Sequence, residues 1–450
     1  MKKTIVFMIC IAMLMGLAGC SGGTDPEHPI TLTMWHVYGS QTESPLNDVI
    51  DEFNRTVGQE KGIIIKVVSV MNSSDIDSAL ISSANGEPGT VEMPDLFTAY
   101  PRIVESIGEE KLLDWDEYMS EEELSNYRED FLAEGYFGDA LYMLPIAKST
   151  ETMFLNKTLF DRFAEDTGIS LEDLATVEGV MDVCNAYCDW SGGGTFYQIN
   201  ELYYYFLSNM AALGEEMIKD GSVDADSDAF ENVFLPLAEA GIYGGLCVGD
   251  GFASDRWKTA EVICNVGSTA SVLYLRDYVT YTDNTTEDVE MAVLPYPVIT
   301  GGDPTVVQRG VGLFGMHSDV EAENKAKVEF VRWLCEKQHN LDFVTKAGYL
   351  PPTNEAFEEL FENISAVENE KYQMLYGAIQ NMYQDGYTFC TIPLFEGAGD
   401  FQPWFEQLIK YTLSTAHETY VERVNAGEDP AMVMEELLSS SLEEVRAVLR

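Results

Sequence analysis

The first part of the chain alternates between two hydrophobic periods. Residues 30–36 place apolar and polar side chains in turn, and this two-residue period predicts a β-strand. Apolar residues then recur every three or four positions, which predicts a helix with one buried face. The order strand–helix–strand–helix–strand favours a parallel sheet whose ligand-binding loops follow the carboxyl ends of its strands. The expected elements are strands over 30–36, 63–70 and 94–100 and helices over 45–58 and 75–85.

The rest of the chain continues this mixture of strands and helices. Residues 140–163 predict a strand, a proline-bearing crossing segment, a second strand and a helix. Residues 170–260 are mainly helical in pattern, and residues 260–271 predict a strand that runs into a loop of small residues. Two further strands are expected over 291–297 and 310–316, and helices from 320 to 450. The pattern as a whole indicates an α/β protein.

The first twenty residues have a different character. Lys2 and Lys3 precede an apolar run over 5–17 that has the length of a signal-peptide core and is too short to cross a bilayer. The sequence LAGC, which ends at Cys20, resembles the bacterial lipobox and implies cleavage before Cys20 and acyl chains on its thiol. An ordinary secretory signal is the alternative. We expect a signal peptide over 1–19, and lipidated Cys20 with a flexible tether over 20–29.

Composition then limits the partners. The chain carries 76 acidic and 26 basic residues, a formal net charge of −50, which argues against nucleic acid or an anionic membrane surface as partner. With 46% hydrophobic residues it has enough apolar side chains for a large core, and 450 residues favour two domains. No segment after the signal is apolar for long enough to span a membrane. These features indicate a body held at the extracytoplasmic face of the cell membrane.

Recognisable catalytic and metal-binding motifs are absent. The sequence has no G-x-S-x-G, Walker A, H-E-x-x-H or strand-to-helix G-x-G-x-x-G motif, and no His or Cys group has zinc-site spacing. We therefore expect no cofactor and no metal, although a glycosidase that uses only carboxylates would leave no such motif. An exported protein can form disulfides, whereas the apolar stretches around Cys264 and Cys335 favour buried free thiols. The cysteines whose redox state stays open are Cys184, Cys188, Cys247, Cys264, Cys335 and Cys390.

An ordered series of segments resembles the extracellular family 1 solute-binding proteins of ABC importers, which include maltose-binding and glycerol-3-phosphate-binding proteins. The resemblance spans about residues 20 to 360, and the last 90 residues match only in being helical. After the lipobox, the segments that carry it are ITLTMWHVYG followed by LNDVIDEFN, LPIAKSTETMFLNKTLF, AEVICNVGSTAS followed by VLPYP, and GVGLFGMHSDVEAENKAKVEFVRWL followed by AGYLPPTNEAF.

The resemblance implies a periplasmic-binding-protein-like fold of two lobes, each a mainly parallel sheet flanked by helices, with the ligand in a cleft between them. Hinge closure around the solute would create the form that the importer recognises. The implied boundaries are 30–146 plus 313–348 for the N-terminal lobe and 147–312 plus 349–450 for the C-terminal lobe. The implied partners are a small carbohydrate and the importer's transmembrane subunits, and a monomer is expected by analogy of fold.

The family's ligand contacts map onto loops and crossing segments of this sequence. Sugars offer C–H patches to aromatic rings and hydroxyls to polar side chains, so both residue types are candidates. Where the family has the pattern YNK, this chain reads Leu155-Asn156-Lys157, so the match is imperfect there. For Ser268 and Thr269 plain N-capping is an alternative role, and for Trp35 packing within its own lobe. The expected ligand-binding residues are Trp35, His36, Tyr38, Tyr100, Ser149, Thr150, Ser268, Thr269, Arg309, Gly310, Tyr349 and Trp404.

The function expected from this resemblance is that of a cell-surface receptor that delivers a mono- or oligosaccharide to an ABC importer without catalysis. A receptor for glycerol 3-phosphate or another phosphorylated polyol is the alternative within the same class. A surface lipoprotein enzyme that acts on polysaccharide is the alternative from another class. A purely adhesive role would need a flat aromatic patch in place of a cleft.

Overall fold

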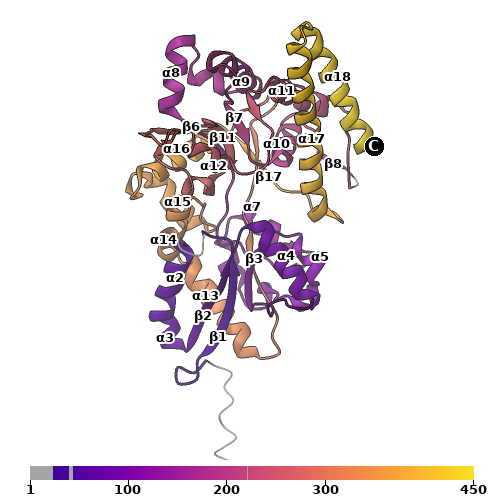
Figure 1. Cartoon of the computed structure of the whole chain (residues 1–450). Coiled ribbons are helices and arrows are strands. Elements are labelled where there is room, and N and C mark those ends of the chain that lie inside the picture. Colours follow the sequence, from indigo (N-terminus) through magenta and orange to yellow (C-terminus); the bar gives the residue numbers. More distant parts are fainter. Residues whose placement is uncertain (1–23, 40–43, 220) are drawn as a thin grey trace, which may run out of the picture. The chain divides into compact units, whose positions relative to one another are not determined.

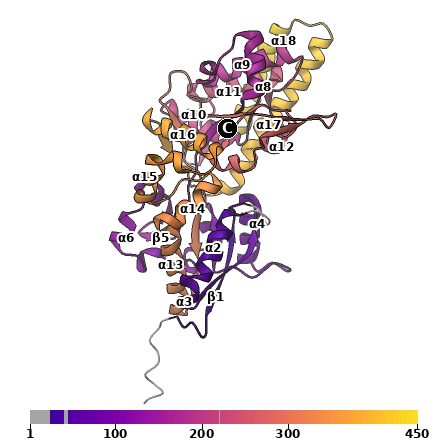
Figure 2. The same ribbon diagram turned by 90° about the vertical axis from the view of Figure 1, so that its left-hand side faces the viewer.

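The computed structural model describes residues 24–39, 44–219 and 221–450. The signal peptide over 1–19 and Cys20 therefore lie outside the described residues. The chain forms two compact units, which are described separately (Figures 1 and 2). Among the described residues, unit 1 comprises those up to Ala99, Ile103–Ile146 and Gly312–Asn340, and unit 2 comprises those in Tyr100–Arg102, Ala147–Val311 and Leu341–Arg450.

Unit 1 is built on a four-stranded sheet in the order β16-β3-β1-β2. Strand β1 (Ile30–His36) pairs in parallel with β2 (Ile63–Val70) and β3 (Leu96–Ala99), whereas β16 (Gly312–Gly315) is antiparallel to β3. The predicted parallel arrangement of the first three strands is thus confirmed. The helices of this unit are α2 (Pro45–Arg55), α3 (Val57–Lys61), α4 (Ser73–Ala84), α5 (Ile103–Ile107), α6 (Glu121–Ser125), α7 (Glu129–Leu132) and α13 (Glu321–Cys335), and α14 (Lys337–Ala347) begins here and continues into unit 2.

Helix α2 illustrates how the sequence determines these elements. Ser44 is its N-cap, with Oγ accepting a hydrogen bond from the Asn47 N–H, and Pro45 occupies the first turn, where its missing N–H costs nothing. The apolar face that was predicted from the sequence is buried, including Phe53, whose ring lies 5.1 Å from that of Phe330 in α13. The helix thereby covers one side of the sheet.

Unit 2 contains a five-stranded sheet in the order β10-β7-β11-β6-β14. Its strands are β6 (Glu151–Asn156), β7 (Tyr197–Ile199), β10 (Leu246–Cys247), β11 (Cys264–Ser268) and β14 (Met291–Leu294). Strand β7 is parallel to both of its neighbours, but β6 is antiparallel to both β11 and β14. The sheet is therefore mixed and not mainly parallel as expected. The direction of β6 differs because this strand follows a crossing segment directly, and no helix precedes it in this unit.

Helices enclose the sheet of unit 2. Helix α10 (Leu202–Ala212) is buried along almost its whole length, and its polar residues are satisfied internally: Ser208 Oγ accepts from the Val307 N–H, and Asn209 donates to the Tyr205 carbonyl. The other helices are α8 (Lys157–Thr167), α9 (Val177–Ser191), α11 (Asp228–Tyr243), α12 (Ala253–Trp257), α15 (Asn354–Glu362), α16 (Glu370–Gln384), α17 (Ala398–Asn425) and α18 (Pro430–Leu449). The short strands outside the main sheet are β8 (Ile218–Lys219) with β9 (Ser222–Val223), β12 (Tyr278–Thr280) with β13 (Thr286–Asp288), and β15 (Thr305–Val307) with β17 (Thr388–Cys390).

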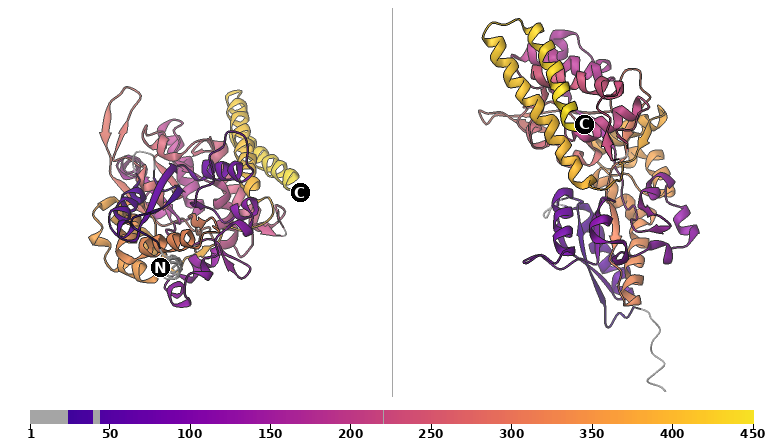
Figure 3. Two further views of the ribbon diagram at one scale, coloured as in Figure 1. Left: turned by 90° about the horizontal axis from the view of Figure 1, so that it is seen from below. Right: turned by 90° about the vertical axis from the view of Figure 1, so that its right-hand side faces the viewer.

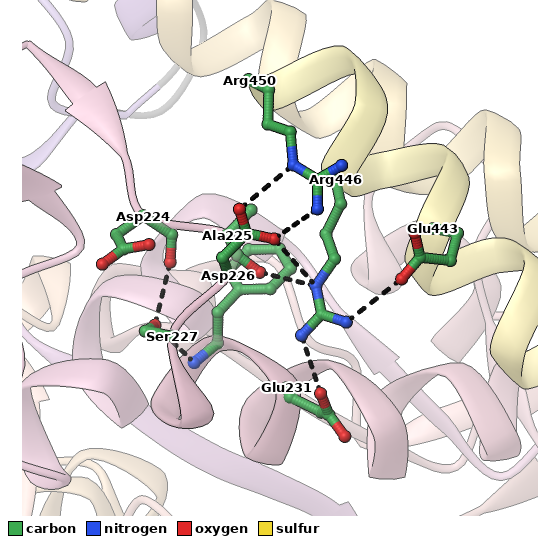
Figure 4. Close-up of polar contacts among 9 residues, drawn as sticks. Asp224, Ala225, Asp226, Ser227, Glu231, Glu443, Arg446 and Arg450 are labelled. Atoms are coloured by element: carbon green, nitrogen blue, oxygen red, sulfur yellow. Dashed lines mark hydrogen bonds and ion pairs between the residues drawn. The ribbon is translucent and has the colours of Figure 1, made fainter.

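The last two helices form a hairpin that packs on α11. Figure 3 shows α17 and α18 side by side, in yellow, at the end of the chain. Arg446 of α18 donates to the Ala225 carbonyl and to Glu231, and Arg450 forms a pair with Asp226 (Figure 4). These contacts fix the C-terminal turn of α18 to the start of α11.

The six cysteines of the described residues are all free thiols. Cys184, Cys188, Cys264 and Cys335 are buried, and Cys247 and Cys390 are half-buried. Burial raises the pKa of Cys335 to about 12. The thiols therefore pack as small apolar groups. Within the residues that the structure describes, helices are either too short or too polar to span a membrane.

Candidate functional site

A buried cluster of charges lies at the centre of the candidate site in unit 2. The guanidinium of Arg309 donates through Nη1 to Glu151 Oε1 at 2.9 Å and to Glu201 Oε2 at 2.7 Å, and through Nη2 to Glu201 Oε1 at 3.0 Å. Its Cζ atom lies 4.4 Å from the centre of the Tyr204 ring, a cation–π distance. Arg309 is thus held by two carboxylates and one aromatic face.

The cluster holds more acid than base. Glu151 is fully buried, and its Oε2 has no hydrogen-bond partner among the described residues. Burial raises the pKa of Glu151, and the charge of Glu201 adds to this, while Arg309 opposes it. A third carboxylate, Glu406 of α17, accepts from the Tyr203 N–H at 2.7 Å, and burial raises its pKa to about 7. Of these three carboxyl groups, only Glu201 is both held by Arg309 and partly exposed to solvent, with its side chain 27% exposed.

Backbone hydrogen bonds hold the predicted crossing segments around this cluster. Ser149 and Arg309 exchange two backbone hydrogen bonds, of 2.8 and 2.7 Å, and the Thr150 hydroxyl donates to the Val307 carbonyl. Gly310 has a φ of 107°, and a Cβ there would lie 3.0 Å from the Cα of Lys148, so the position requires glycine. The local framework is therefore rigid where Ser149, Thr150, Arg309 and Gly310 meet.

Two predicted tyrosines lie next to the charge cluster. Burial lowers the pKa of Arg309. The charge of Glu201 raises this pKa, and Tyr100 and Tyr204 raise it to a smaller extent. Burial raises the pKa of Tyr349, Tyr100 adds to this effect, and Arg309 opposes it. The Tyr349 carbonyl accepts a hydrogen bond from the Tyr376 hydroxyl at 2.9 Å. Tyr100 and Tyr349 thus lie within electrostatic range of Arg309.

Ser268 and Thr269 begin a short 3-10 helix, Thr269–Leu273. The Ser268 hydroxyl accepts from the Ala270 N–H at 3.3 Å, so it serves as an N-cap, the alternative role considered from the sequence. The Thr269 N–H donates to the Thr150 carbonyl, and its fully buried hydroxyl has no partner among the described residues. Both residues adjoin the crossing segment.

Trp404 extends an aromatic cluster from the same region. Its side chain is 43% exposed, and its ring lies 5.5 Å from Phe401, which in turn lies 6.2 Å from Tyr203. Tyr203 neighbours Tyr204 at 5.6 Å between ring centres. Ring contacts therefore run without interruption from the Arg309 cluster to Trp404.

The three predicted residues of unit 1 are buried. Trp35 packs in a hydrophobic cluster and is 3% exposed, and Tyr38 is fully buried. His36 Nε2 bonds to Asn47 Oδ1 at 2.8 Å, and burial lowers its pKa to about 4. Within unit 1 these side chains pack in their own core, as the alternative reading of Trp35 anticipated.

Sequence reasoning missed Glu151, Glu201 and Tyr204. With 76 acidic residues in the chain, composition alone gives no reason to select two of them. The available signal was position, because Glu201 follows β7 and precedes α10, the kind of strand-to-helix junction at which ligand contacts occur in α/β folds.

Comparison with known proteins places this geometry in context. The family model of the bacterial extracellular solute-binding proteins matches residues 48–370. No curated protein sequence matches the chain significantly.

Solved structures resemble the chain over nearly its whole length. A binding protein for cyclic α-maltosyl-1,6-maltose from Arthrobacter globiformis has a TM-score of 0.65 at 15% identity, with 94% of this chain and 99% of that chain covered. UgpB from Mycobacterium tuberculosis, in complex with glycerophosphocholine, has a TM-score of 0.67 at 15% identity, covering 94% and 100%. A substrate-binding protein from Listeria monocytogenes, in complex with cycloalternan, has a TM-score of 0.66 at 12% identity, covering 93% and 99%. These matches confirm the predicted two-lobe α/β fold.

Proposed function

Because the chain belongs to the bacterial extracellular solute-binding proteins, we propose that it is the receptor of an ABC importer and that its solute is a carbohydrate. The observation that carries this proposal is the position of Glu201. Its carboxylate is oriented by two hydrogen bonds from Arg309 and remains 27% exposed. An oriented, accessible carboxylate suits the hydroxyls of a sugar, and the exposed ring of Trp404 is available for the C–H face of a sugar.

The chemistry of binding follows from these groups. Each oxygen of Glu201 retains a lone pair for a sugar hydroxyl after bonding to Arg309. Tyr349 and Trp404 supply rings for the C–H faces of sugars, and Tyr100 a further phenol. Closure of the two lobes around the solute is the proposed signal to the importer's transmembrane subunits. The receptor is proposed to act as a monomer.

The bonding of Arg309 argues against the alternative of a phosphorylated polyol. An anion-binding arginine needs a charge that is not already compensated and N–H groups that a solute can reach, but Nη1 and Nη2 donate to Glu151 and Glu201, and Nε, which has no partner among the described residues, is buried. The partly exposed carboxylate of Glu201 further disfavours an anionic solute. We therefore place a neutral saccharide ahead of glycerol 3-phosphate, although one similar structure holds glycerophosphocholine.

Isothermal titration calorimetry of the purified protein tests the proposal. Maltose, maltotriose and a cyclic tetrasaccharide are compared with glycerol 3-phosphate and glycerophosphocholine. We expect a saccharide to bind and Glu201→Gln to weaken it roughly 10- to 100-fold, the effect of losing a charged acceptor. Glu261→Gln, which changes an exposed acid elsewhere in unit 2, is the matched control and should bind like the wild type. Binding of the phosphorylated polyols alone would contradict the proposal.

The absence of catalysis is part of the same proposal. The family consists of binding proteins, and in the candidate site the carboxylates of Glu151 and Glu201 are joined through Arg309. We expect the bound saccharide to be recovered intact after overnight incubation, as measured by chromatography. Release of shorter sugars would establish the polysaccharide-degrading alternative.

We further propose that Cys20 is lipidated and holds the receptor at the membrane. The lipobox LAGC supports this proposal, and two acyl chains give stable attachment. In bacterial expression, the wild type should label with radioactive palmitate and enter the detergent phase on Triton X-114 partition. Cys20→Ala should do neither. Equal partition of the two proteins would indicate an ordinary secretory signal.

A further inference from the structure

Unit 1 carries a groove lined by apolar and acidic residues. Its volume is about 670 Å³. Four buried side chains form the floor: Met119, Leu124, Tyr127 and Leu132. Helices α6 and α7, labelled in Figures 2 and 1, supply several of its lining residues, and Tyr136 of β4 (Tyr136–Phe137) also lines it.

Three carboxylates surround this floor. Asp116, Glu121 and Glu129 come from three successive elements, a 3-10 turn, α6 and α7. Asp116 accepts a hydrogen bond from the Tyr136 hydroxyl at 3.3 Å, and Glu121 and Glu129 are exposed. Within the described part of the chain, none of the three forms an ion pair.

The neighbouring cations are already engaged. Arg128 pairs with Asp130 and lies over the Phe131 ring, and Arg332 pairs with Glu123. Partial burial raises the pKa of Asp116, and the charge of Asp114 adds to this, so a cation from outside would stabilise its ionised form. The negative charge of the three groove carboxylates is therefore not compensated by these neighbouring arginines.

These features select one kind of occupant. Arginine and lysine side chains combine an apolar stem with a cationic head, so the stem can lie on Leu124 and Leu132 while the head reaches the rim. The exposed ring of Tyr136 offers a cation–π contact, and methionine adapts to varied shapes. Because the three carboxylates come from three separate elements, a polypeptide that presents several cations can engage them at the same time.

We propose that the groove lined by Asp116, Glu121, Glu129 and Tyr136 is a docking surface for an arginine- or lysine-bearing segment of a partner protein. The complementarity of charge gives specificity and a fast encounter, and the apolar floor supplies contact area. The proposal is independent of which solute the protein binds.

Fluorescence anisotropy with a labelled hexa-arginine peptide and the full chain tests the proposal at 150 mM NaCl. Glu121→Lys with Glu129→Lys should weaken binding at least about tenfold. The matched control, Glu87→Lys with Glu92→Lys, changes the net charge equally at exposed positions of the same unit and should alter affinity less than twofold. Equal losses in the two variants, or no loss in the first, would overturn the proposal.

Two further measurements identify the occupant and the role of the ring. Tyr136→Ser should weaken the hexa-arginine peptide roughly threefold and a hexa-lysine peptide less, because arginine stacks better on an aromatic face. Spermidine at the same concentration of positive charge should displace the peptide poorly. Displacement by spermidine as effective as by unlabelled peptide would assign the groove to small cations and overturn the docking surface.

Discussion

At the scale of single residues, Arg309 is the point on which the site of unit 2 depends. It donates to Glu151, a carboxyl group with no exposure to water, and to Glu201. Burial already raises the pKa of Glu151, and Arg309→Ala would raise it further and keep the group neutral at pH 7, so we expect a loss of about 1–3 kcal/mol in the free energy of unfolding from the lost hydrogen bonds of Arg309. Urea denaturation at pH 7 measures this loss.

A double variant separates the loss of hydrogen bonds from packing. Arg309→Met combined with Glu151→Leu removes both polar groups and should recover most of the stability lost by Arg309→Ala, because apolar residues can replace a buried, hydrogen-bonded pair at little cost. If Arg309→Ala lost less than about 1 kcal/mol, the cluster would be more hydrated than its burial implies.

His36 should make the stability depend on pH. Its pKa is about 4 in the folded protein against 6.5 for a free histidine, because it is buried and neutral. The unfolded chain therefore binds the extra proton first, so this contribution to stability is complete above pH 6.5 and is lost as the pH falls towards 4, by about 3 kcal/mol. The stability difference between the wild type and His36→Gln should shrink over this range in urea denaturation. A difference that stays constant from pH 7 to 4 would contradict the assignment.

The residues of the site were only partly accessible to sequence reasoning. Arg309, Tyr349, Tyr100 and Ser149 were selected as candidates through a family resemblance, and in the structure Ser149 bonds to Arg309 while both tyrosines lie within its electrostatic range. Glu201 was not, because its partner Arg309 is 108 positions away and no local pattern reports so distant a contact. The burial of Trp35 is likewise a tertiary property, since an aromatic residue at a strand end fits either role.

At the scale of elements, the hydrophobic periodicity of the sequence predicted the longer strands and helices. The strand over 63–70 and the helix that begins at Pro45 appear as predicted, since each spans enough residues to show its period. Strands β7 and β10, of three and two residues, were absorbed into a region expected to be mainly helical. A strand that short offers no alternation to detect, and only its neighbours in the sheet define it.

The hairpin of α17 and α18 gives a prediction about one element. Arg446, whose side chain is 13% exposed, bonds to Ala225 and Glu231, so Arg446→Ala should cost about 1–2 kcal/mol and speed amide hydrogen exchange in α18. Arg450→Ala is the control, because that side chain is 55% exposed and its solvated pair with Asp226 should contribute little to the free energy of unfolding. Equal effects of the two variants would contradict the proposed anchoring by Arg446.

At the scale of the whole molecule, the net charge of −50 governs the response to salt. Like charges repel across the folded body, and screening shortens their range from about 30 Å at 0.01 M salt to about 3 Å at 1 M. We expect the Tm to rise between 10 and 500 mM NaCl, as measured by differential scanning calorimetry. KCl should act equally, because the effect is one of screening, and a falling Tm would show that surface ion pairs outweigh the repulsion.

The burial of most thiols has a practical consequence for following this receptor at work. Cys184, Cys188, Cys264 and Cys335 are enclosed in the interior, and burial raises the pKa of half-buried Cys390 to about 12, which keeps it protonated and slow to react at neutral pH. Among these six cysteines, half-buried Cys247 is the one that would be replaced by serine, after which a maleimide dye would attach preferentially to a cysteine introduced on the surface of each lobe. Energy transfer between two such dyes would turn the protein into an optical sensor for its solute.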